Sequence, residues 1–299
     1  MSEKSFTLPS FAKLNLHLEV LGKRDDGYHE LCTIFQTVSL HDTLTFEECG
    51  EVRLSCDDSR IPTDGRNLIV KAAQLLQERK NITAGASIRL EKRIPSPGGL
   101  GGGSANAAVA LFGLIKLWNI EVSFEELAEI AASLGSDVPF FLYGGTAIGS
   151  GRGTEVVPIT DFDEKYILIV TPNIAVSTRD AFEALNAPSL TTDAAKRILH
   201  NCRFDAESMD LRRSTLKNDF ETTVFAAHPE IKNVKQMLLD LGARQAMMSG
   251  SGASVFAVFD KEETRQTTLK ALENKLNWRT FAVATISREQ YREALEIAY

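Results

Sequence analysis

A run of glycines between Pro95 and Ser104 is the segment of this 299-residue chain whose chemistry is clearest. Glycine has no Cβ and tolerates positive φ, so successive backbone N–H groups can turn toward one point and approach an anion closely. An apolar, alanine-rich stretch follows directly and is typical of a helix, which would begin at Gly103 or Ser104. Its first turn would add unpaired N–H groups and the helix dipole. The loop therefore predicts a site for a phosphate-bearing ligand.

Two common phosphate-binding motifs are excluded by what surrounds these glycines. No Gly-Lys-Ser/Thr sequence follows them, so the loop is not a Walker A motif. The glycines are too clustered for a dinucleotide-binding fingerprint, and Glu121, about twenty residues further on, lies outside any obvious second strand. A flexible hairpin or linker is the alternative, but a linker rarely runs straight into a tightly apolar helix. The anion site is therefore the favoured interpretation.

Asp137 and the turn from Ser249 to Gly252 are two further candidates for the same chemistry. Asp137 follows a predicted helix end at Gly135 and stands among apolar residues. Its carboxylate could accept a proton from a hydroxyl, bind a metal ion or cap a turn, and taken alone the capping role is favoured. The turn from Ser249 to Gly252 precedes an apolar strand and could approach the glycine loop, although such a turn is more often only structural.

Alternating and apolar stretches predict the elements that must position these groups. Apolar and polar residues alternate between Phe11 and Leu21, which is the period of a half-buried strand. Ser123 and Glu126 match a helix start, and Gly135 matches the end of that helix. Further predicted elements are strands at Leu31 to Leu40, Asp42 to Glu47, Glu51 to Cys56, Ser87 to Ile94, Tyr166 to Val170 and Ala253 to Phe259, with charged or glycine-containing turns between the early ones, and a buried helix at Ser104 to Trp118. This order predicts an α+β protein of two layered domains with a boundary near residues 157–165.

Composition excludes some classes of protein. The net charge of −7 argues against a general nucleic-acid binder. The first ten residues are charged and have no apolar core, so they do not form a signal peptide. Prolines and glycines interrupt the uncharged run from Ile94 to Ile115, which is therefore not expected to span a membrane, and a cytoplasmic protein is expected. The cysteines lack the spacing of a zinc site, and free thiols are favoured over a possible disulfide between Cys49 and Cys56.

Three segments, in this order, resemble the three motifs of the GHMP kinases (galacto-, homoserine, mevalonate and phosphomevalonate kinases). They are an N-terminal strand with a basic residue, the loop from Pro95 to Ala105 and the turn from Ser249 to Gly252, and their order and the distances between them extend over nearly the whole chain. The resemblance implies the two-domain α+β fold of that superfamily. Residues 1–160 would form a domain like the second domain of ribosomal protein S5, and residues 161–299 a ferredoxin-like domain, with the active site in the cleft between them.

The N-terminal segments narrow the resemblance further. Pro9 to Leu16 and Gly22 to Leu31 resemble the family of 4-diphosphocytidyl-2-C-methyl-D-erythritol kinases, and Gly135 to Phe140 is similar to the catalytic stretch of that family, with Ser136 where alanine is more usual. The resemblance implies transfer of the γ-phosphoryl group of ATP to the 2-hydroxyl of 4-CDP-2-C-methyl-D-erythritol, in the non-mevalonate route to isoprenoid precursors. The family's catalytic pair corresponds to Lys13 and Asp137. Asp137 would take the hydroxyl proton, and Lys13 would orient the hydroxyl and balance developing charge.

The resemblance also implies which residues bind the two substrates. Tyr28 and Phe182 would sandwich the cytosine, His29 would read its edge, and Asn15 would contact the erythritol or its diphosphate, although a core role for Phe182 is equally open. ATP would be bound as its Mg²⁺ complex, with Ser104 as a candidate to touch the ion and no dedicated protein ligand identified. The predicted ATP site comprises Pro95, Ser96, Pro97, Gly98, Gly99, Leu100, Gly101, Gly102, Gly103, Ser104 and Ala105, bordered near the purine by Lys92 and Asn67.

Other functions stay open at this point. The nearest is another GHMP kinase, such as a homoserine or mevalonate kinase, whose substrates contain no base for Tyr28 and His29 to stack on. A non-catalytic nucleotide- or RNA-binding module is a second alternative, and the acidic balance counts against RNA. The expected partner is the small-molecule substrate, with no nucleic acid and no membrane, and the protein is expected to be a monomer or a homodimer.

Overall fold

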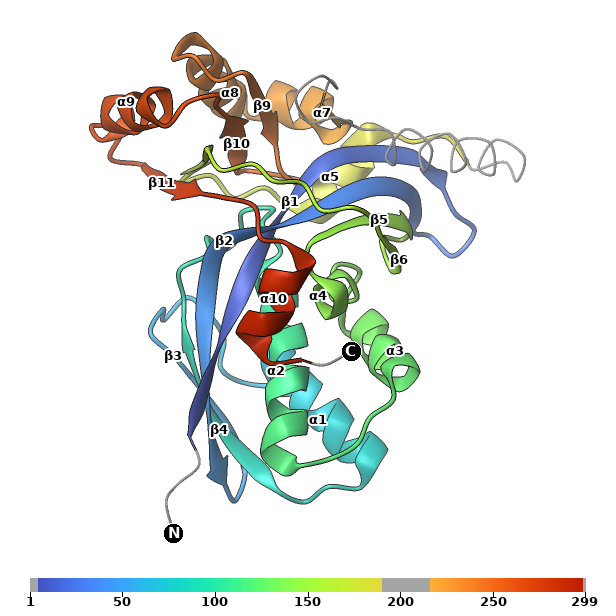
Figure 1. The fold of residues 1–299 in the computed structure, drawn as a ribbon. Coiled ribbons are helices and arrows are strands. Elements are labelled where there is room, and N and C mark those ends of the chain that lie inside the picture. The colour runs from blue at the N-terminus through green and yellow to red at the C-terminus, as the bar shows by residue number, and fades with distance from the viewer. Residues whose placement is uncertain (1–4, 190–215, 298–299) are drawn as a thin grey trace.

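The computed structural model describes residues 5–189 and 216–297, which form two sheets with helices packed on them (Figure 1). The larger sheet has strand order β3-β4-β2-β1-β8, and β5 and β6 extend it from β2. The smaller sheet has the order β11-β7-β10-β9. The mixture of mostly antiparallel sheets and packed helices confirms the predicted α+β class.

The predicted strands occur in the predicted order with shifted ends, whereas β5, β6, β8, β9 and β11 were not predicted. The strands are β1 (Phe6–Lys23), β2 (His29–Cys49), β3 (Val52–Cys56), β4 (Gly85–Glu91), β5 (Thr146–Gly151), β6 (Glu155–Pro158), β7 (Ile167–Pro172), β8 (Lys217–Asn218), β9 (Gln245–Met248), β10 (Val255–Val258) and β11 (Trp278–Val283). The helices are α1 (Leu68–Lys80), α2 (Gly102–Trp118), α3 (Phe124–Leu134), α4 (Phe140–Tyr143), α5 (Thr178–Leu185), α7 (Phe220–Ala227), α8 (Pro229–Asp240), α9 (Glu262–Leu272) and α10 (Arg288–Leu295). None of the helices in the described ranges combines the length and the apolar character that a membrane crossing requires.

The long antiparallel pair β1 and β2 connects the parts of the molecule. Its residues enter all three apolar clusters of the interior, as Leu8 does in the first, Leu14 in the second and Leu18 in the third. The prediction of two strands at 31–40 and 42–47 is wrong, because β2 runs through Asp42 without a turn. Asp42 is buried beside the ammonium of Lys92, so its charge is compensated inside the sheet and does not end the strand.

A helical layer covers one side of the larger sheet, where α1, α2, α3 and α10 lie together (Figure 1). The α2 helix is buried from Ala105 to Leu114, as its apolar sequence predicts. The Ser123 hydroxyl accepts a hydrogen bond from the Glu126 N–H at 3.2 Å, which confirms the predicted start of α3. This layer fixes the two ends that matter for the site, the start of α2 and the turn after α3.

The end of the chain returns to the first cluster. The predicted boundary at 160/161 falls between β6 and β7, whereas α10, far beyond it, packs Tyr291 into the cluster that holds the helical layer together. The Tyr291 hydroxyl is buried and donates to the Phe141 carbonyl in α4 at 2.6 Å. Cys49 and Cys56, at the ends of β2 and β3, are free thiols, as the sequence favours, whereas Cys32 is disulfide-bonded, contrary to that expectation. The last helix is thus part of the layer that supports the turn at Asp137.

Tyr291→Phe is expected to destabilise the protein by about 1–2 kcal/mol, because the ring is kept while the buried Phe141 carbonyl loses its donor. Urea unfolding followed by circular dichroism measures this loss. Tyr143→Phe is the matched control, since no hydrogen bond of that hydroxyl is found among the described residues. Equal losses in the two variants would contradict the importance of the bond to Phe141.

Candidate active site

A cavity of about 900 Å³ collects most of the residues that the sequence singles out. Its wall is formed by the glycine loop, the middle of β1, the turn between β1 and β2, the turn after α3, the turn between β5 and β6, the start of α5 and the turn after β9. The predicted site residues in this wall are Lys13, Asn15, Tyr28, His29, Asp137, Phe182 and every residue from Pro95 to Ser104. Segments from both halves of the chain therefore meet at one space.

The turn after β9 forms direct hydrogen bonds with the glycine loop. The Ser249 hydroxyl donates to the Gly99 carbonyl at 3.0 Å, and the Ser254 N–H donates to the Gly98 carbonyl at 3.2 Å. The predicted approach of the two glycine-rich segments is thereby confirmed. Gly99 has a φ of +72°, and a Cβ added there would lie 2.1 Å from the Ser249 carbonyl oxygen. Only glycine fits this position without moving one of the two segments.

The start of α2 faces the cavity. The helix begins at Gly102, one or two residues before the predicted start at Gly103 or Ser104, and these three residues all line the wall. The N–H groups of a first helical turn have no partner within the helix, and the dipole places partial positive charge at this end. The geometry therefore suits an anion at the point where the sequence predicts one.

Lys13 and Asp137 face each other beside this loop. The Lys13 ammonium lies 3.5 Å from Asp137 Oδ2, and it donates to the Gly99 carbonyl at 3.0 Å and to Asn15 Oδ1. The Lys13 side chain is 3% exposed, whereas that of Asp137 is 34% exposed. The lysine is therefore fixed within the wall, and the carboxylate is open to a molecule in the cavity.

The turn that carries Asp137 leaves its carboxylate available. The Val138 N–H donates to the Gly135 carbonyl at 3.2 Å, and the Phe141 N–H donates to the Val138 carbonyl at 3.1 Å, so the backbone closes the turn by itself. Within the described ranges no backbone N–H donates to the Asp137 carboxylate. Among the described residues, therefore, no hydrogen bond supports the capping role that was favoured for Asp137 taken alone.

Asn15 is a positioning group for Lys13 in this arrangement. It is buried, its Oδ1 accepts from the Lys13 ammonium, and its Nδ2 donates to the Thr33 hydroxyl at 2.7 Å. Its backbone N–H also donates to the Ser249 hydroxyl at 3.3 Å. Asn15 therefore connects β1 to the same serine that holds the glycine loop.

Aromatic side chains form the far end of the cavity. The His29 ring stacks on Phe182 with 4.7 Å between centroids, and Phe182 meets Phe220 edge-on at 4.8 Å. Phe182 thus lines the cavity and also packs toward the core, so the structure accommodates both interpretations of it. Burial, with a smaller contribution from the positive charge of Lys23, lowers the pKa of His29, and the neutral ring can then accept a hydrogen bond as well as donate one.

Tyr28 is 52% exposed at the cavity mouth, and the guanidinium of Arg152 lies 4.5 Å from the centre of its ring. Sequence reasoning missed Arg152, which stands in the turn between β5 and β6. It also missed Thr178, whose hydroxyl lies 2.9 Å from that of Ser251 in the predicted turn after β9. Arg152 belongs to no motif and no periodic pattern. Arg152 lies beside Tyr28 because β5 pairs with β2, and no local sequence pattern predicts that pairing.

Three predicted residues lie outside the wall. Ala105 is buried in α2, and Lys92 is buried against Asp42. Asn67 caps α1, where its Oδ1 accepts from the Ile69 N–H at 2.9 Å and its Nδ2 donates to the Pro62 carbonyl at 2.7 Å. The contact of Lys92 and Asn67 with a purine stays a prediction.

Comparison with known proteins agrees with this geometry. The model of the GHMP kinases N terminal domain matches residues 67–145, and that of the GHMP kinases C terminal domain matches residues 199–277. The 4-diphosphocytidyl-2-C-methyl-D-erythritol kinase of Solibacter usitatus is 39% identical over 289 residues, covering 95% of this chain and 90% of that one. The corresponding protein of Enterococcus faecalis is 41% identical over 266 residues, covering 87% and 92%.

Solved structures give the same picture. The crystal structure of a 4-(cytidine 5'-diphospho)-2C-methyl-D-erythritol kinase aligns with a TM-score of 0.74 at 32% identity, over 94% of this chain and 99% of that one. A homoserine kinase from Cytophaga hutchinsonii aligns with a TM-score of 0.71 at 21% identity, over 96% of each chain. The second match is at the level of the fold alone.

Proposed function

Because this chain belongs to the 4-diphosphocytidyl-2-C-methyl-D-erythritol kinase family of the GHMP kinases, we propose that it uses Lys13 and Asp137 to phosphorylate 4-CDP-2-C-methyl-D-erythritol with ATP. The observation that carries this proposal is the shared cavity. It joins an anion-binding loop, an open carboxylate beside a buried lysine, and two aromatic side chains, the exposed Tyr28 and the half-buried His29. These are the parts needed to hold a triphosphate, a hydroxyl and a pyrimidine.

The reaction can be written on these residues. The 2-hydroxyl of the substrate lies beside Asp137, which accepts its proton while the oxygen bonds to the γ-phosphorus and the bond to the β-phosphate oxygen of ATP breaks, releasing ADP. Lys13 orients the hydroxyl and balances the negative charge. The glycine loop and the start of α2 bind the phosphates through backbone N–H groups. A tertiary alcohol is a hindered nucleophile, so the fixed position of Lys13 contributes as much as proton removal does.

Mg²⁺ fits this site as an ion carried by the nucleotide. The described part of the chain has no group of three or more acidic, histidine or cysteine side chains that could hold a metal alone. Mg²⁺ in such sites is bound mainly by phosphate oxygens and water with one or two protein groups. Ser104 lines the cavity at the start of α2, and its hydroxyl would supply such an oxygen. The ion would neutralise negative charge on the β- and γ-phosphates.

The assay that tests the function compares three acceptors. Purified protein with ATP and Mg²⁺ is given 4-CDP-2-C-methyl-D-erythritol, homoserine or mevalonate, and the position of the new phosphate is read by NMR. We expect transfer to the 2-hydroxyl of the cytidyl substrate only. Transfer to homoserine or mevalonate with none to the cytidyl substrate would refute the proposal, and an absence of substrate-stimulated ATP turnover would favour a binding module.

Tyr28→Ala is expected to raise the KM for the cytidyl substrate about 5- to 150-fold, the equivalent of roughly 1–3 kcal/mol for one aromatic stack. In the structure the His29 ring stacks on Phe182, so a base held between Tyr28 and Phe182 would replace that contact. The KM for ATP should stay unchanged. Tyr28→Phe keeps the ring and is the control, expected to behave like the parent. An unchanged substrate KM in Tyr28→Ala would contradict the stacking role.

We further infer the setting in which the enzyme works. The acidic net charge and the small-molecule substrate suit a cytoplasmic enzyme that needs no nucleic acid or membrane. A monomer or a homodimer is expected. Light scattering of the purified protein distinguishes these two states.

A further inference from the structure

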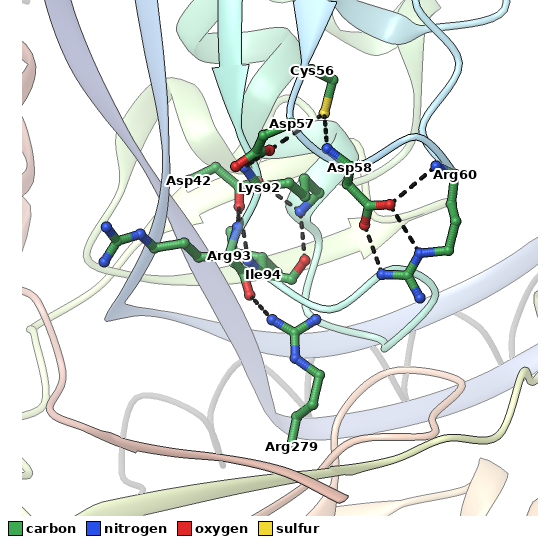
Figure 2. Close-up of polar contacts among 9 residues, drawn as sticks. All are labelled: Asp42, Cys56, Asp57, Asp58, Arg60, Lys92, Arg93, Ile94 and Arg279. Atoms are coloured by element: carbon green, nitrogen blue, oxygen red, sulfur yellow. Dashed lines mark hydrogen bonds and ion pairs between the residues drawn. The ribbon is translucent and has the colours of Figure 1, made fainter. Parts of the chain in front are cut away.

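A buried ion pair stands directly behind the glycine loop. The ammonium of Lys92 lies 2.7 Å from Asp42 Oδ2, and the two side chains are 5% and 0% exposed (Figure 2). Removing both charges from water is costly unless their remaining polar atoms are also satisfied. Replacement by apolar residues of similar size is often neutral or stabilising in such places. Stability alone is therefore a weak reason for this pair.

The pair fixes the chain at the point where it leaves β4 for the glycine loop. Asp42 Oδ1 accepts from the N–H groups of Arg93 at 2.7 Å and Ile94 at 2.8 Å. The Lys92 ammonium donates to the Ile94 carbonyl at 2.6 Å as well as to Asp42. One carboxylate and one ammonium thus hold consecutive residues that lead directly into Pro95.

Two other elements hold the same segment. Asp57, just after β3, accepts from the Lys92 N–H at 2.8 Å. Arg279, in β11 of the other sheet, donates to the Arg93 carbonyl at 2.7 Å (Figure 2). The segment that leads into the loop is therefore held by hydrogen bonds from both sheets. Such a segment is rigid and does not act as a hinge.

The pair also lies close to the start of α2. A Cβ added at Gly102 would be 3.1 Å from Lys92 Nζ and 3.0 Å from Ile94 Cγ2. Gly102 lines the cavity, whereas neither Lys92 nor Asp42 does, so the ammonium stands behind the helix start. Because the charges of Lys92 and Asp42 compensate each other, the pair acts on this helix start by holding its position and not by adding net positive charge. Burial lowers the pKa of Lys92, and the charge of Asp42 acts in the opposite direction.

We propose that Lys92 and Asp42 are positioning residues for ATP, which act on the nucleotide through the backbone of Arg93 and Ile94 and through the start of α2. Lys92 then has an indirect role in place of the predicted contact with the purine. This inference rests on the proposed function, because it assumes that the glycine loop receives the phosphates of ATP.

Lys92→Met tests the proposal, because methionine fills the space of the lysine stem without its charge or its hydrogen bonds. We expect the Kd for ATP, measured by calorimetry without the second substrate, to rise at least about tenfold, with the KM for ATP rising in parallel. The KM for the cytidyl substrate should stay within about twofold of the parent, since Lys92 does not line the cavity, whereas Tyr28 and His29 do. Circular dichroism at the assay temperature verifies that the variant is folded.

Lys80→Met is the matched control. It removes a lysine from a partly buried pair with Glu126 (2.9 Å) between α1 and α3, and neither residue lines the cavity. A purely structural role for Lys92 would lower the unfolding midpoint in both variants and leave the Kd for ATP unchanged in both, and that result would overturn the proposal. In Asp42→Asn/Lys92→Met both charges are gone. A Kd that stays raised supports the proposal, and a return to the parental Kd overturns it.

Arg279→Gln covers the case in which Lys92→Met does not fold. Arg279 is exposed, and its replacement removes the hydrogen bond to the Arg93 carbonyl and the contact of the guanidinium with the Phe281 ring. The variant should therefore fold and raise the Kd for ATP about two- to fivefold. An unchanged Kd would count against the anchored loop. A parent protein that does not phosphorylate the cytidyl substrate would refute the proposed function, whereas an active parent with unaffected variants would refute this inference alone.

Discussion

Asp137→Asn is expected to lower kcat by about 10²- to 10⁴-fold while the Kd for ATP stays within about threefold of the parent. The amide has the size of the carboxylate but cannot accept the proton of the substrate hydroxyl. Asp137 is open to the cavity, and within residues 5–189 and 216–297 its ion pair is with Lys13 at 3.5 Å. Lys13 keeps its bonds to Gly99 and Asn15 in the variant, so the loop that binds the phosphates should be undisturbed.

The measurement is steady-state turnover with both substrates saturating, beside calorimetric binding of ATP. Asp163→Asn is the matched control, because Asp163 is an exposed carboxylate that does not line the cavity, and its kcat should equal that of the parent. A kcat within a few-fold of the parent in Asp137→Asn would show that Asp137 is not the base. Catalysis would then rest on positioning and on charge stabilisation alone, which phosphoryl transfer permits.

The parts of the site that could be predicted are those with a local signature. The glycine loop, Asp137 and the turn at Ser249 each stand out in a few residues of sequence, and the structure brings all of them to one cavity. The contact between Ser249 and Gly99 joins residues 150 positions apart. Hydrophobic periodicity relates only residues that are close in sequence. The sequence could therefore suggest that the two turns meet, but not the geometry of their contact.

The errors in predicting the fold have a common physical cause. A charged residue in a strand pattern ordinarily indicates a turn, and the predicted break between the strands 31–40 and 42–47 falls directly before Asp42. Its partner Lys92 is 50 positions away, and the pair is what permits the charge to stay inside β2. The return of α10 to the first cluster is equally non-local, because it depends on the buried bond from Tyr291 to Phe141. Compensation by a distant residue is invisible to local patterns.

Gly99→Ala is expected to lower kcat/KM for ATP by about 100-fold, because the added methyl group cannot coexist with the present loop geometry. The left-handed φ of +72° costs a non-glycine residue roughly 1–2 kcal/mol, and the Cβ would lie 2.1 Å from the Ser249 carbonyl oxygen. Either the glycine loop or the turn after β9 must shift. A shift of the loop also moves the Gly99 carbonyl away from the Lys13 ammonium and from the Ser249 hydroxyl. The variant should therefore disturb both the phosphate-binding loop and the lysine beside Asp137.

Gly65→Ala separates this effect from the general cost of replacing a glycine. Gly65 lies in an exposed loop with nothing within 4 Å of an added Cβ and has no positive φ, so its replacement should leave kcat/KM and the unfolding midpoint close to the parental values. Gly99→Ala should lower both quantities. If instead Gly99→Ala lowered the midpoint but kept the parental kcat/KM for ATP, the contact with Ser249 would serve stability alone. The phosphates of ATP would then be bound by the start of α2 without the help of the loop that precedes it.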